Sequence, residues 1–226
     1  MKEIFATIEN VLTFELIKTE YILFIFMKEE ISAIVKSEAQ AILNIPINDS
    51  YQKAIDIIYE RVHGLKGKLI ASGMGKAGQI AINMATTFSS TGTPAVFLHP
   101  ADAQHGDLGV LQENDVLLII SNSGRTREIL ELVELSKRLY QNIPKIVITG
   151  NLNSDLAKIA DVCLHTGEPA EVCPLGLTPT TSTTVMTVIG DVLVVSLMKR
   201  INFSHIEYAK RHHGGYLGEK SRNATK

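Results

Sequence analysis

The chain has 226 residues, of which 45% are hydrophobic and 20% charged, and its formal net charge is -2. This composition is typical of a globular protein with one α/β domain and excludes a mainly disordered chain. A charge so close to zero also argues against binding nucleic acid through a basic surface. The two cysteines, Cys163 and Cys173, come with no secretory signal pattern, so we expect reduced thiols in a cytoplasmic protein.

A short apolar run, residues 21–26 (YILFIF), lies between charged residues near the N-terminus. It is far shorter than the roughly 20 apolar residues of a membrane span, and no small-residue cleavage site follows it. The sequence therefore predicts neither a membrane anchor nor a signal peptide. Met27 opens a better-formed amphipathic segment than Met1 does. We expect residues 1–26 to be an extension dispensable for function and residues 27–226 to form one domain with a polar C-terminal arm.

Hydrophobic periodicity predicts two N-terminal helices, over residues 29–45 and 50–62. The pattern then changes to short apolar runs, which predict strands over residues 68–72, 95–98, 116–121, 145–149 and 162–164. Helices are expected over residues 75–89, 126–140 and 180–199, with a short one near Leu156. Strands that are apolar throughout and alternate with helices indicate a parallel sheet covered on both faces. We predict an α/β fold, a three-layer, doubly wound, five-stranded parallel sheet with N-terminal helices.

The loop after the first strand, residues 72–78 (SGMGKAG), contains a G-x-G-x-x-G pattern. A dinucleotide site also needs an acidic residue closing the second strand, but Asp102 is displaced into a loop. The spacing before Lys76 is not that of a P-loop, and a lysine suits an anion or a carbonyl oxygen. An NAD-dependent dehydrogenase is thus a remote alternative. We expect this loop to contact a phosphorylated substrate, without a cofactor, through Ser72, Gly73, Gly75 and Lys76.

The loop after the third strand, residues 121–128 (SNSGRTRE), opens a helix, and helix amino ends attract anions. Arg125 and Arg127 lie at that positive end, where a bound phosphomonoester would offset their charge. The alternative is a capped surface helix whose arginines pair with Glu128 and Glu131. The candidate phosphate ligands are Ser121, Asn122, Ser123, Gly124 and Thr126.

A third hydroxyl-rich segment, residues 178–184 (TPTTSTT), leads into the last long helix. Serine and threonine commonly cap helices, but this segment has more hydroxyls than one cap needs. We therefore expect Thr181 and Ser182 to contact the ligand. In a flavodoxin-like strand order the first and third strands are neighbours, so the loops that follow them should converge on one ligand at the carboxyl edge of the sheet.

Several titratable residues are expected near the same site. A lysine, two carboxylates and two imidazoles suit sugar-phosphate isomerisation, in which a proton moves between adjacent carbons through an enediolate. Remote binding of the phosphate can orient the reacting carbons, and no metal or redox cofactor is needed. The candidate catalytic residues are Lys76, His105, Glu128, Glu171 and His212.

Each candidate has a structural alternative. Glu128 in a first helical turn is favoured by the helix dipole in any case. His105 can fix a turn, and although it could join His99 and Asp102 at a metal, no standard ligand spacing supports that site. Glu171 and His212 can be ordinary surface residues. Their joint occurrence is what favours an enzyme.

Together these segments resemble the sugar isomerase (SIS) domain, and within it the D-arabinose-5-phosphate isomerase family. The resemblance runs from about residue 31 to residue 218 and depends on SGMGKAG, STGTPAVFLHPADAQHGDLG, ISNSGRTREI, EVCPLGLTPTTSTT and KRHHGGYLG. It implies a flavodoxin-like SIS fold over residues 27–226. It also implies an aldose–ketose isomerase that interconverts D-ribulose 5-phosphate and D-arabinose 5-phosphate and so feeds Kdo (3-deoxy-D-manno-octulosonate) and lipopolysaccharide synthesis.

For the site, the resemblance implies the same five catalytic residues and a phosphate loop of Ser121, Ser123 and Thr126. Glu171 or His105 would shuttle the proton, while Lys76 and Glu128 would act on the substrate oxygens. The resemblance further implies a homotetramer with active sites at subunit interfaces, where His212 would close the site of a neighbouring subunit.

Two features depart from the family pattern. A tandem CBS pair often follows this domain, whereas here the sequence stops soon after Gly218, so we expect any regulation to act on the catalytic domain, with CMP-Kdo as a product inhibitor in the cleft. The tail reads His212-His213-Gly-Gly instead of His-Pro-Gly-Gly, and losing the proline removes a restriction on φ. Either histidine could then face the site.

Other functions compatible with the fold are a non-catalytic sugar-phosphate sensor and an isomerase of a hexulose or heptose phosphate.

Overall fold

The computed structural model describes residues 26–224, which belong to two compact units, residues 1–43 and 44–226. The described part of the first unit is one helix, residues 26–43, which confirms the helix predicted over residues 29–45. Pro46 follows closely, and a residue before proline disfavours helical geometry, so the helix ends there. The apolar run of residues 21–26 falls almost wholly outside the described residues. The dispensability of residues 1–26 stays a prediction.

The second unit alternates strands and helices as predicted. Its strands are β1 (Leu69–Gly73), β2 (Ala95–Phe97), β3 (Val116–Ile120), β4 (Lys145–Thr149) and β5 (Val162–His165). Its α-helices are α2 (Asp49–Ile58), α3 (Gly75–Ser90), α4 (Pro100–Ala103), α5 (Arg127–Leu139), α6 (Asp155–Ile159), α7 (Thr181–Arg200), α8 (His205–Arg211) and α9 (Gly215–Asn223). A π-helical turn (Tyr59–Gly64) extends α2, and a 3₁₀ turn (Asp107–Val110) precedes β3.

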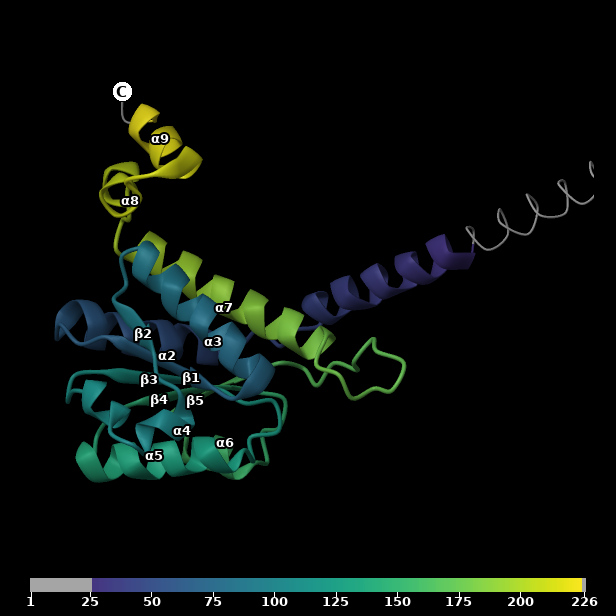
Figure 1. Ribbon diagram of the computed structural model, residues 1–226, viewed down its shortest axis with the longest axis horizontal. Coiled ribbons are helices and arrows are strands. Elements are labelled where there is room, and N and C mark those ends of the chain that lie inside the picture. Colours follow the sequence, from purple (N-terminus) through teal and green to yellow (C-terminus); the bar gives the residue numbers. More distant parts are fainter. Residues whose placement is uncertain (1–25, 225–226) are drawn as a thin grey trace, which may run out of the picture. The chain divides into compact units, whose positions relative to one another are not determined.

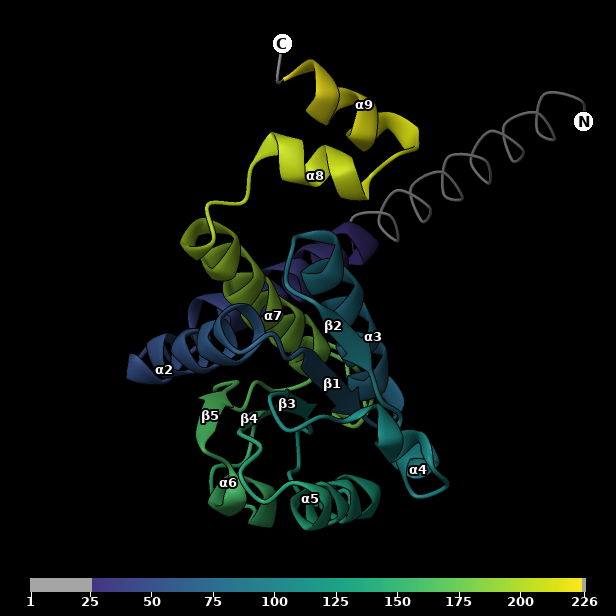
Figure 2. The same ribbon diagram turned by 90° about the vertical axis from the view of Figure 1, so that its left-hand side faces the viewer.

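The five strands form one parallel sheet in the order β2-β1-β3-β4-β5, so the predicted flavodoxin-like order is confirmed. Helices α2, α3 and α7 cover one face, and α4, α5 and α6 cover the other, as Figure 1 and the turned view in Figure 2 show. The predicted three layers are therefore present. This arrangement brings the loops after β1 and β3 side by side at the carboxyl edge.

The core lies on both faces of the central strands. Every residue of β1 and β3 is buried, because helices pack on each face of the sheet. Ile129, Leu132 and Val133 of α5 pack on one face with residues of β3 and β4. On the other face α3 and α7 approach closely, with the Met84 side chain against Gly190.

Among residues 26–224, one helix has the length and apolar composition of a membrane span, namely α7, Thr181–Arg200. Half of the apolar window in α7 is buried inside the protein, and the helix packs along α3. These are also the properties of a core helix in a globular protein.

Four short elements were not predicted: α4, the 3₁₀ turn, α8 and α9. The first two have only four residues each, too few to show a periodic pattern. The start of α8 did carry a signal, because Ser204 and Glu207 have the spacing of a capping box and the Ser204 hydroxyl accepts from the Glu207 N–H at 3.2 Å. The C-terminal arm is thus two short, mostly exposed helices.

Candidate active site

A cleft of about 310 Å³ opens at the carboxyl edge of the sheet, between the ends of β1 and β3. The amino ends of three helices, α3, α5 and α7, supply its walls. Residues from all three predicted loops meet here. The lining residues are Met74, Lys76, Ala77, Ile120, Ser121, Asn122, Ser123, Thr126, Pro179, Ser182, Thr183 and Met186.

The loop of residues 121–126 is held by contacts with residues 149–154, and its own residues also line the cleft. The Ser154 hydroxyl lies against Gly124, whose positive φ of 62° favours glycine. The Asn122 carbonyl accepts from the Gly150 N–H at 3.0 Å and from the Thr149 hydroxyl at 3.2 Å. The loop is therefore held by contacts within the protein itself.

The hydroxyls of this loop gather where α5 begins. Ser121 Oγ and Thr126 Oγ1 lie 3.2 Å apart, and the Arg125 N–H donates to Ser123 Oγ at 3.3 Å. Thr126 precedes α5, but no side chain caps that end of the helix. The first N–H groups of a helix have no partner within it, so the end of α5 suits an anion.

The loop after β1 presents a cation beside that end. Gly75, with φ of 56°, turns the chain from β1 into α3, and Lys76 in the first turn of α3 lines the cleft. No side chain caps the amino end of α3 either. Two uncapped helix ends and one ammonium group thus border the same hollow.

The amino end of α7 differs, because Glu171 occupies it. Glu171 Oε2 accepts from the Thr180 N–H at 2.7 Å, from the Thr180 hydroxyl at 2.9 Å and from the Ser182 N–H at 3.3 Å. Burial alone would raise the pKa of the Glu171 carboxyl, but the hydrogen bonds from Ser182 and Thr180 outweigh burial and lower it. The amino end of α7 is therefore occupied by a carboxylate, whereas no side chain caps the amino ends of α3 and α5.

Other predicted ligands support the cleft without lining it. The buried Ser72 hydroxyl donates to the Leu98 carbonyl at 2.7 Å, and the buried Thr181 hydroxyl accepts from the Val172 N–H at 3.2 Å. Gly73 ends β1 beside α3. Among the predicted ligands and catalytic residues, those that line the cleft are Lys76, Ser121, Asn122, Ser123, Thr126 and Ser182.

His105 and Glu128 belong to the same edge of the sheet but do not line the cleft. His105 lies exposed between α4 and the 3₁₀ turn, in the connection from β2. Glu128 is half-buried in the first turn of α5, one residue after the Arg127 that pairs with Glu131 at 2.7 Å. The Arg127–Glu131 ion pair is one of the pairs expected under the alternative interpretation of this segment as a capped surface helix.

His212 lies at the other edge of the sheet, apart from the cleft of its own chain. Its ring stacks on Tyr208 at 3.8 Å between ring centroids, Tyr208 contacts Phe203 edge-on, and Phe203 packs against Gly92 beyond the end of α3. Figures 1 and 2 both show α8 and α9 beyond the end of α7 that is far from the cleft. His213 is exposed, whereas His212 is half-buried with Nδ1 3.0 Å from the Tyr208 carbonyl.

The apolar part of the cleft was not predicted from the sequence. Met74, Ile120 and Met186 add hydrophobic surface to the walls, and Ala77, Pro179 and Thr183 complete the lining. Met74 and Ala77 lie inside the SGMGKAG segment, so their position in a predicted ligand loop, and not their residue type, could have identified them as lining residues.

Among residues 26–224, no group of three or more His, Cys, Asp or Glu side chains is arranged to hold a metal ion. Of the three residues considered as metal ligands, His99, Asp102 and His105, two form a contact, with His99 Nδ1 3.6 Å from Asp102 Oδ2.

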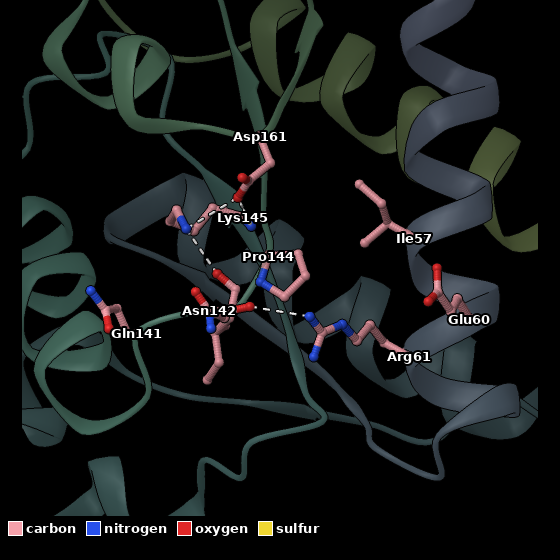
Figure 3. Close-up of a pocket in the computed structure, with 9 residues that line it drawn as sticks. Ile57, Glu60, Arg61, Gln141, Asn142, Pro144, Lys145 and Asp161 are labelled. Carbon is pink, nitrogen blue, oxygen red and sulfur yellow. Dashed lines mark hydrogen bonds and ion pairs between the residues drawn. The ribbon is translucent and has the colours of Figure 1, made fainter.

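A second hollow, of about 380 Å³, opens at the amino edge where β4 and β5 begin (Figure 3). Both of its cations, Arg61 and Lys145, are engaged with the protein itself. Arg61 donates to the Asn142 carbonyl at 3.1 Å, and Lys145 Nζ lies 3.1 Å from Asp161 Oδ2. Among the described residues, the lining of this hollow includes no amino end of a helix. Its helical residues, such as Arg61, lie at the end of α2 and in the turn that follows it.

Known proteins resemble this chain in sequence and in structure. Residues 65–196 match the family model described as SIS domain. The arabinose 5-phosphate isomerase KdsD of Yersinia pestis is 46% identical over 186 residues, 82% of this chain and 55% of that protein. The chain thus spans about half the length of the curated relatives it matches.

Two solved structures extend the comparison. A Bacteroides fragilis protein, named as a candidate phosphosugar isomerase involved in capsule formation, is 66% identical with a TM-score of 0.83 and covers 84% of this chain and 99% of its own. A protein of Escherichia coli CFT073, solved in complex with arabinose 5-phosphate, is 32% identical with a TM-score of 0.76 and covers 82% and 97%. With the family model matching more than half of its residues, this chain belongs to the SIS domain family.

Proposed function

We propose that this protein is an aldose–ketose isomerase that interconverts D-ribulose 5-phosphate and D-arabinose 5-phosphate. The observation that carries the proposal is the cleft at the carboxyl edge, where two uncapped helix ends and Lys76 surround a set of hydroxyls. A phosphate bound at the amino end of α5 would receive N–H groups and the hydroxyls of Ser123 and Thr126.

The rest of the sugar would then lie toward α3 and α7. Lys76 would stabilise the oxygen that becomes negative as the enediolate forms, which is the role of a fixed cation beside developing charge. Glu171 or His105 would carry the proton between C1 and C2, and Glu128 would act on the ring oxygen of cyclic arabinose 5-phosphate. The phosphate anchor would supply the binding free energy that orients the reacting carbons.

The relatives support this substrate class. Several curated relatives at 45–47% identity bear the name arabinose 5-phosphate isomerase, and a structural relative was solved with arabinose 5-phosphate bound. A Kdo pathway role follows if the substrate is the same. Because this chain spans only about half of the curated relatives, the activity has to be measured on this chain.

The test is proton NMR of ribulose 5-phosphate with the purified protein in deuterium oxide, without added metal or nicotinamide. We expect arabinose 5-phosphate carrying solvent deuterium at C2, because the enediolate exchanges its proton with the shuttling group and solvent. Binding of the sugar phosphate without product or exchange would contradict the proposal and indicate a sensor. Turnover of a hexulose or heptose phosphate alone would keep the isomerase class and change the substrate.

We also propose a cytoplasmic homotetramer in which His212 closes the cleft of a neighbouring subunit. The distance of His212 from its own cleft and the exposed apolar side chains Val192 and Val195 on α7 support an assembly. Mixing inactive Lys76→Met and His212→Ala proteins should restore part of the activity if each site combines two chains. No restoration, with a tetramer seen by light scattering, would place both residues in one chain.

A product inhibitor is the last part of the proposal. CMP-Kdo carries a phosphodiester and a carboxylate, so it could compete for the helix ends that bind the substrate phosphate. We expect competitive inhibition by CMP-Kdo. Unchanged kinetics in saturating CMP-Kdo would contradict this part of the proposal.

A further inference from the structure

The carboxylate of Glu171 is held by a residue that the catalytic scheme does not use. Thr180 precedes α7 and donates twice to Glu171 Oε2, from its N–H at 2.7 Å and from its hydroxyl at 2.9 Å. Glu171 lies nine residues earlier in the chain, so these two bonds close the segment of residues 171–180 into a loop. The loop contributes Pro179 to the cleft.

The two donor groups of Thr180 are separate from the bonds that build the helix. The Thr180 carbonyl accepts from the N–H groups of Thr183 and Thr184, each at 3.1 Å, as the first turn of α7 requires. Changing the Thr180 side chain therefore removes one donor to Glu171 and leaves the backbone bonds of the turn in place.

We propose that Thr180 is a positioning residue, whose hydroxyl holds the Glu171 carboxylate at the amino end of α7 in the orientation that the proton transfer needs. This inference rests on the proposed isomerase function, in which Glu171 acts on the substrate. Thr180 itself need not touch the sugar.

The hydroxyl has two effects on Glu171. It fixes one carboxylate oxygen, so the side chain keeps a single rotamer beside the cleft. It also favours the ionised form, since a donor to a carboxylate lowers its pKa, in the direction found for Glu171. Removing the hydroxyl should loosen the carboxylate and raise its pKa together.

Among residues 26–224, the Glu171 carboxylate forms no ion pair, and its partners are hydrogen-bond donors of Thr180 and Ser182. The first turn of α7 holds no charged group, and Lys76 of α3 lines the same cleft as Ser182. In the segment before Glu171, Glu168 pairs with His165 at 3.5 Å. Cys173 in the same loop receives N–H groups led by that of Thr178, which lower its pKa to about 7.

The test compares Thr180→Val, which keeps the shape and removes the hydroxyl, with Thr180→Ser, which keeps the hydroxyl. Thr187→Val is the matched control, because the Thr187 hydroxyl donates at 2.9 Å to the Thr183 carbonyl on the same helix and does not touch Glu171. We expect kcat of Thr180→Val to fall about tenfold with KM within about twofold, the factor that one hydrogen bond to a charged group is worth. Thr180→Ser and Thr187→Val should stay within about twofold of the original protein.

The pH profile separates positioning from a general loss of structure. In Thr180→Val the acid limb of kcat should move to higher pH by up to about one unit, because Glu171 loses a donor to its ionised form. Cys173→Ser, made in both backgrounds, removes the contribution of the thiol near neutral pH. Carbon-13 NMR of labelled glutamate carboxyls, with Glu171→Gln used to assign the signal, measures the same shift without turnover.

Three results would decide the matter. No isomerisation by the original protein would overturn the proposed function, and the carboxyl titration would still test the contact between Thr180 and Glu171. Normal kcat and an unmoved acid limb in Thr180→Val would overturn the positioning role alone. Equal losses in Thr180→Val and Thr187→Val, with lowered melting temperatures and no shift in the limb, would reduce Thr180 to a stabiliser of α7.

Discussion

The two edges of the sheet each carry a hollow with charged residues, and the two differ in what remains available to a ligand. At the amino edge, Arg61 and Lys145 are bound to protein oxygens (Figure 3). At the carboxyl edge, the ends of α3 and α5 have no side-chain cap, and Lys76 stands beside them. The hollow at the amino edge is the larger, at about 380 Å³ against about 310 Å³, so volume does not identify the site.

Two carboxylates, Asp115 at the amino edge and Glu171 at the carboxyl edge, show the same difference between the two edges. Asp115 at the amino edge is fully buried and accepts from the Lys68 N–H, the Lys68 ammonium and the Gln112 N–H, at 2.7 to 2.8 Å. Glu171 at the carboxyl edge also accepts several hydrogen bonds but is only partly buried beside an open cleft. The same donor chemistry serves structure in one place and, in our account, catalysis in the other.

The largest expected effect comes from removing the cation at the carboxyl edge. Lys76→Met should lower kcat/KM by about a thousandfold, because a fixed cation beside a developing oxyanion supplies several kcal/mol. The fold should survive, since Lys76 is exposed at the start of α3. Steady-state kinetics with circular dichroism checks both statements. Activity within tenfold of the original would place the oxyanion elsewhere.

The second effect is on stability and belongs to the amino edge. Asp115→Asn should lower the free energy of unfolding by about 3 kcal/mol, because the buried amide turns a donor toward the N–H groups or the partly buried ammonium that Asp115 now accepts from. The melting temperature should drop by roughly 8 °C for a chain of this size. Isomerase activity below the transition should be unchanged. A loss of activity without a loss of stability would contradict the division between the two edges.

The third effect tests the phosphate loop. Ser123→Ala should raise KM about tenfold and change kcat little, because one hydroxyl is lost from the phosphate ligands. The loop stays in place, since Gly124 and Asn122 are held by their own contacts. A matched control is Ser154→Gly, which removes a hydroxyl that bonds the Asn151 carbonyl and the Ala157 N–H and is not a candidate phosphate ligand. Equal KM for Ser123→Ala and the original protein would exclude this hydroxyl from binding.

The two cysteines give a pH-dependent prediction for the loop of residues 171–180. Hydrogen bonds led by the Thr178 N–H lower the pKa of Cys173 to about 7, while burial raises the pKa of Cys163. A lowered thiol pKa means that the thiolate is already present near neutral pH. Iodoacetamide should therefore modify Cys173 several times faster than Cys163 at pH 7, with the rate rising through about pH 7. Peptide mass spectrometry measures both rates, and equal rates would mean that the loop does not hold its N–H groups on Cys173.

The smallest effect is expected at the hollow of Figure 3. Lys145→Met removes a cation that resembles Lys76 in charge but is already paired with Asp161. Stability should change by less than about 1 kcal/mol, the usual worth of a partly exposed ion pair, and kcat/KM should not change. Lys145→Met and Lys76→Met together form a matched pair for the two edges. A large loss of activity in Lys145→Met would reverse their roles.

Much of this arrangement could be predicted from local sequence. The hydroxyls of residues 121–126 and Lys76 lie in loops directly after buried strands, and parallel topology brings such loops together. The fold was predictable for the same reason, because its strands are apolar runs and its helices are amphipathic. The short α4 was not predictable, since four residues show too little periodicity, whereas α8 has only seven residues but its start is marked by the capping-box spacing of Ser204 and Glu207.

What could not be predicted depends on contacts distant in sequence. The cap on α7 comes from Glu171, nine residues before Thr180, and only the folded loop brings the carboxylate to the helix end. The place of His212 follows from length, because a helix of 20 residues spans about 30 Å and carries the chain from the carboxyl edge to the other edge. The family motifs in the sequence include both His212 and the residues of the cleft, but they do not show whether a single copy of the chain brings them together.

The ligand site is tested most directly by an amide ¹H–¹⁵N NMR titration of the protein with arabinose 5-phosphate. We expect the largest shifts at residues 75–76 and 123–128, where uncapped N–H groups would meet the phosphate, and none at residues 141–143, Lys145 or Asp161. Shifts confined to residues 141–143, Lys145 and Asp161 would contradict this expectation and make the hollow of Figure 3 the ligand site.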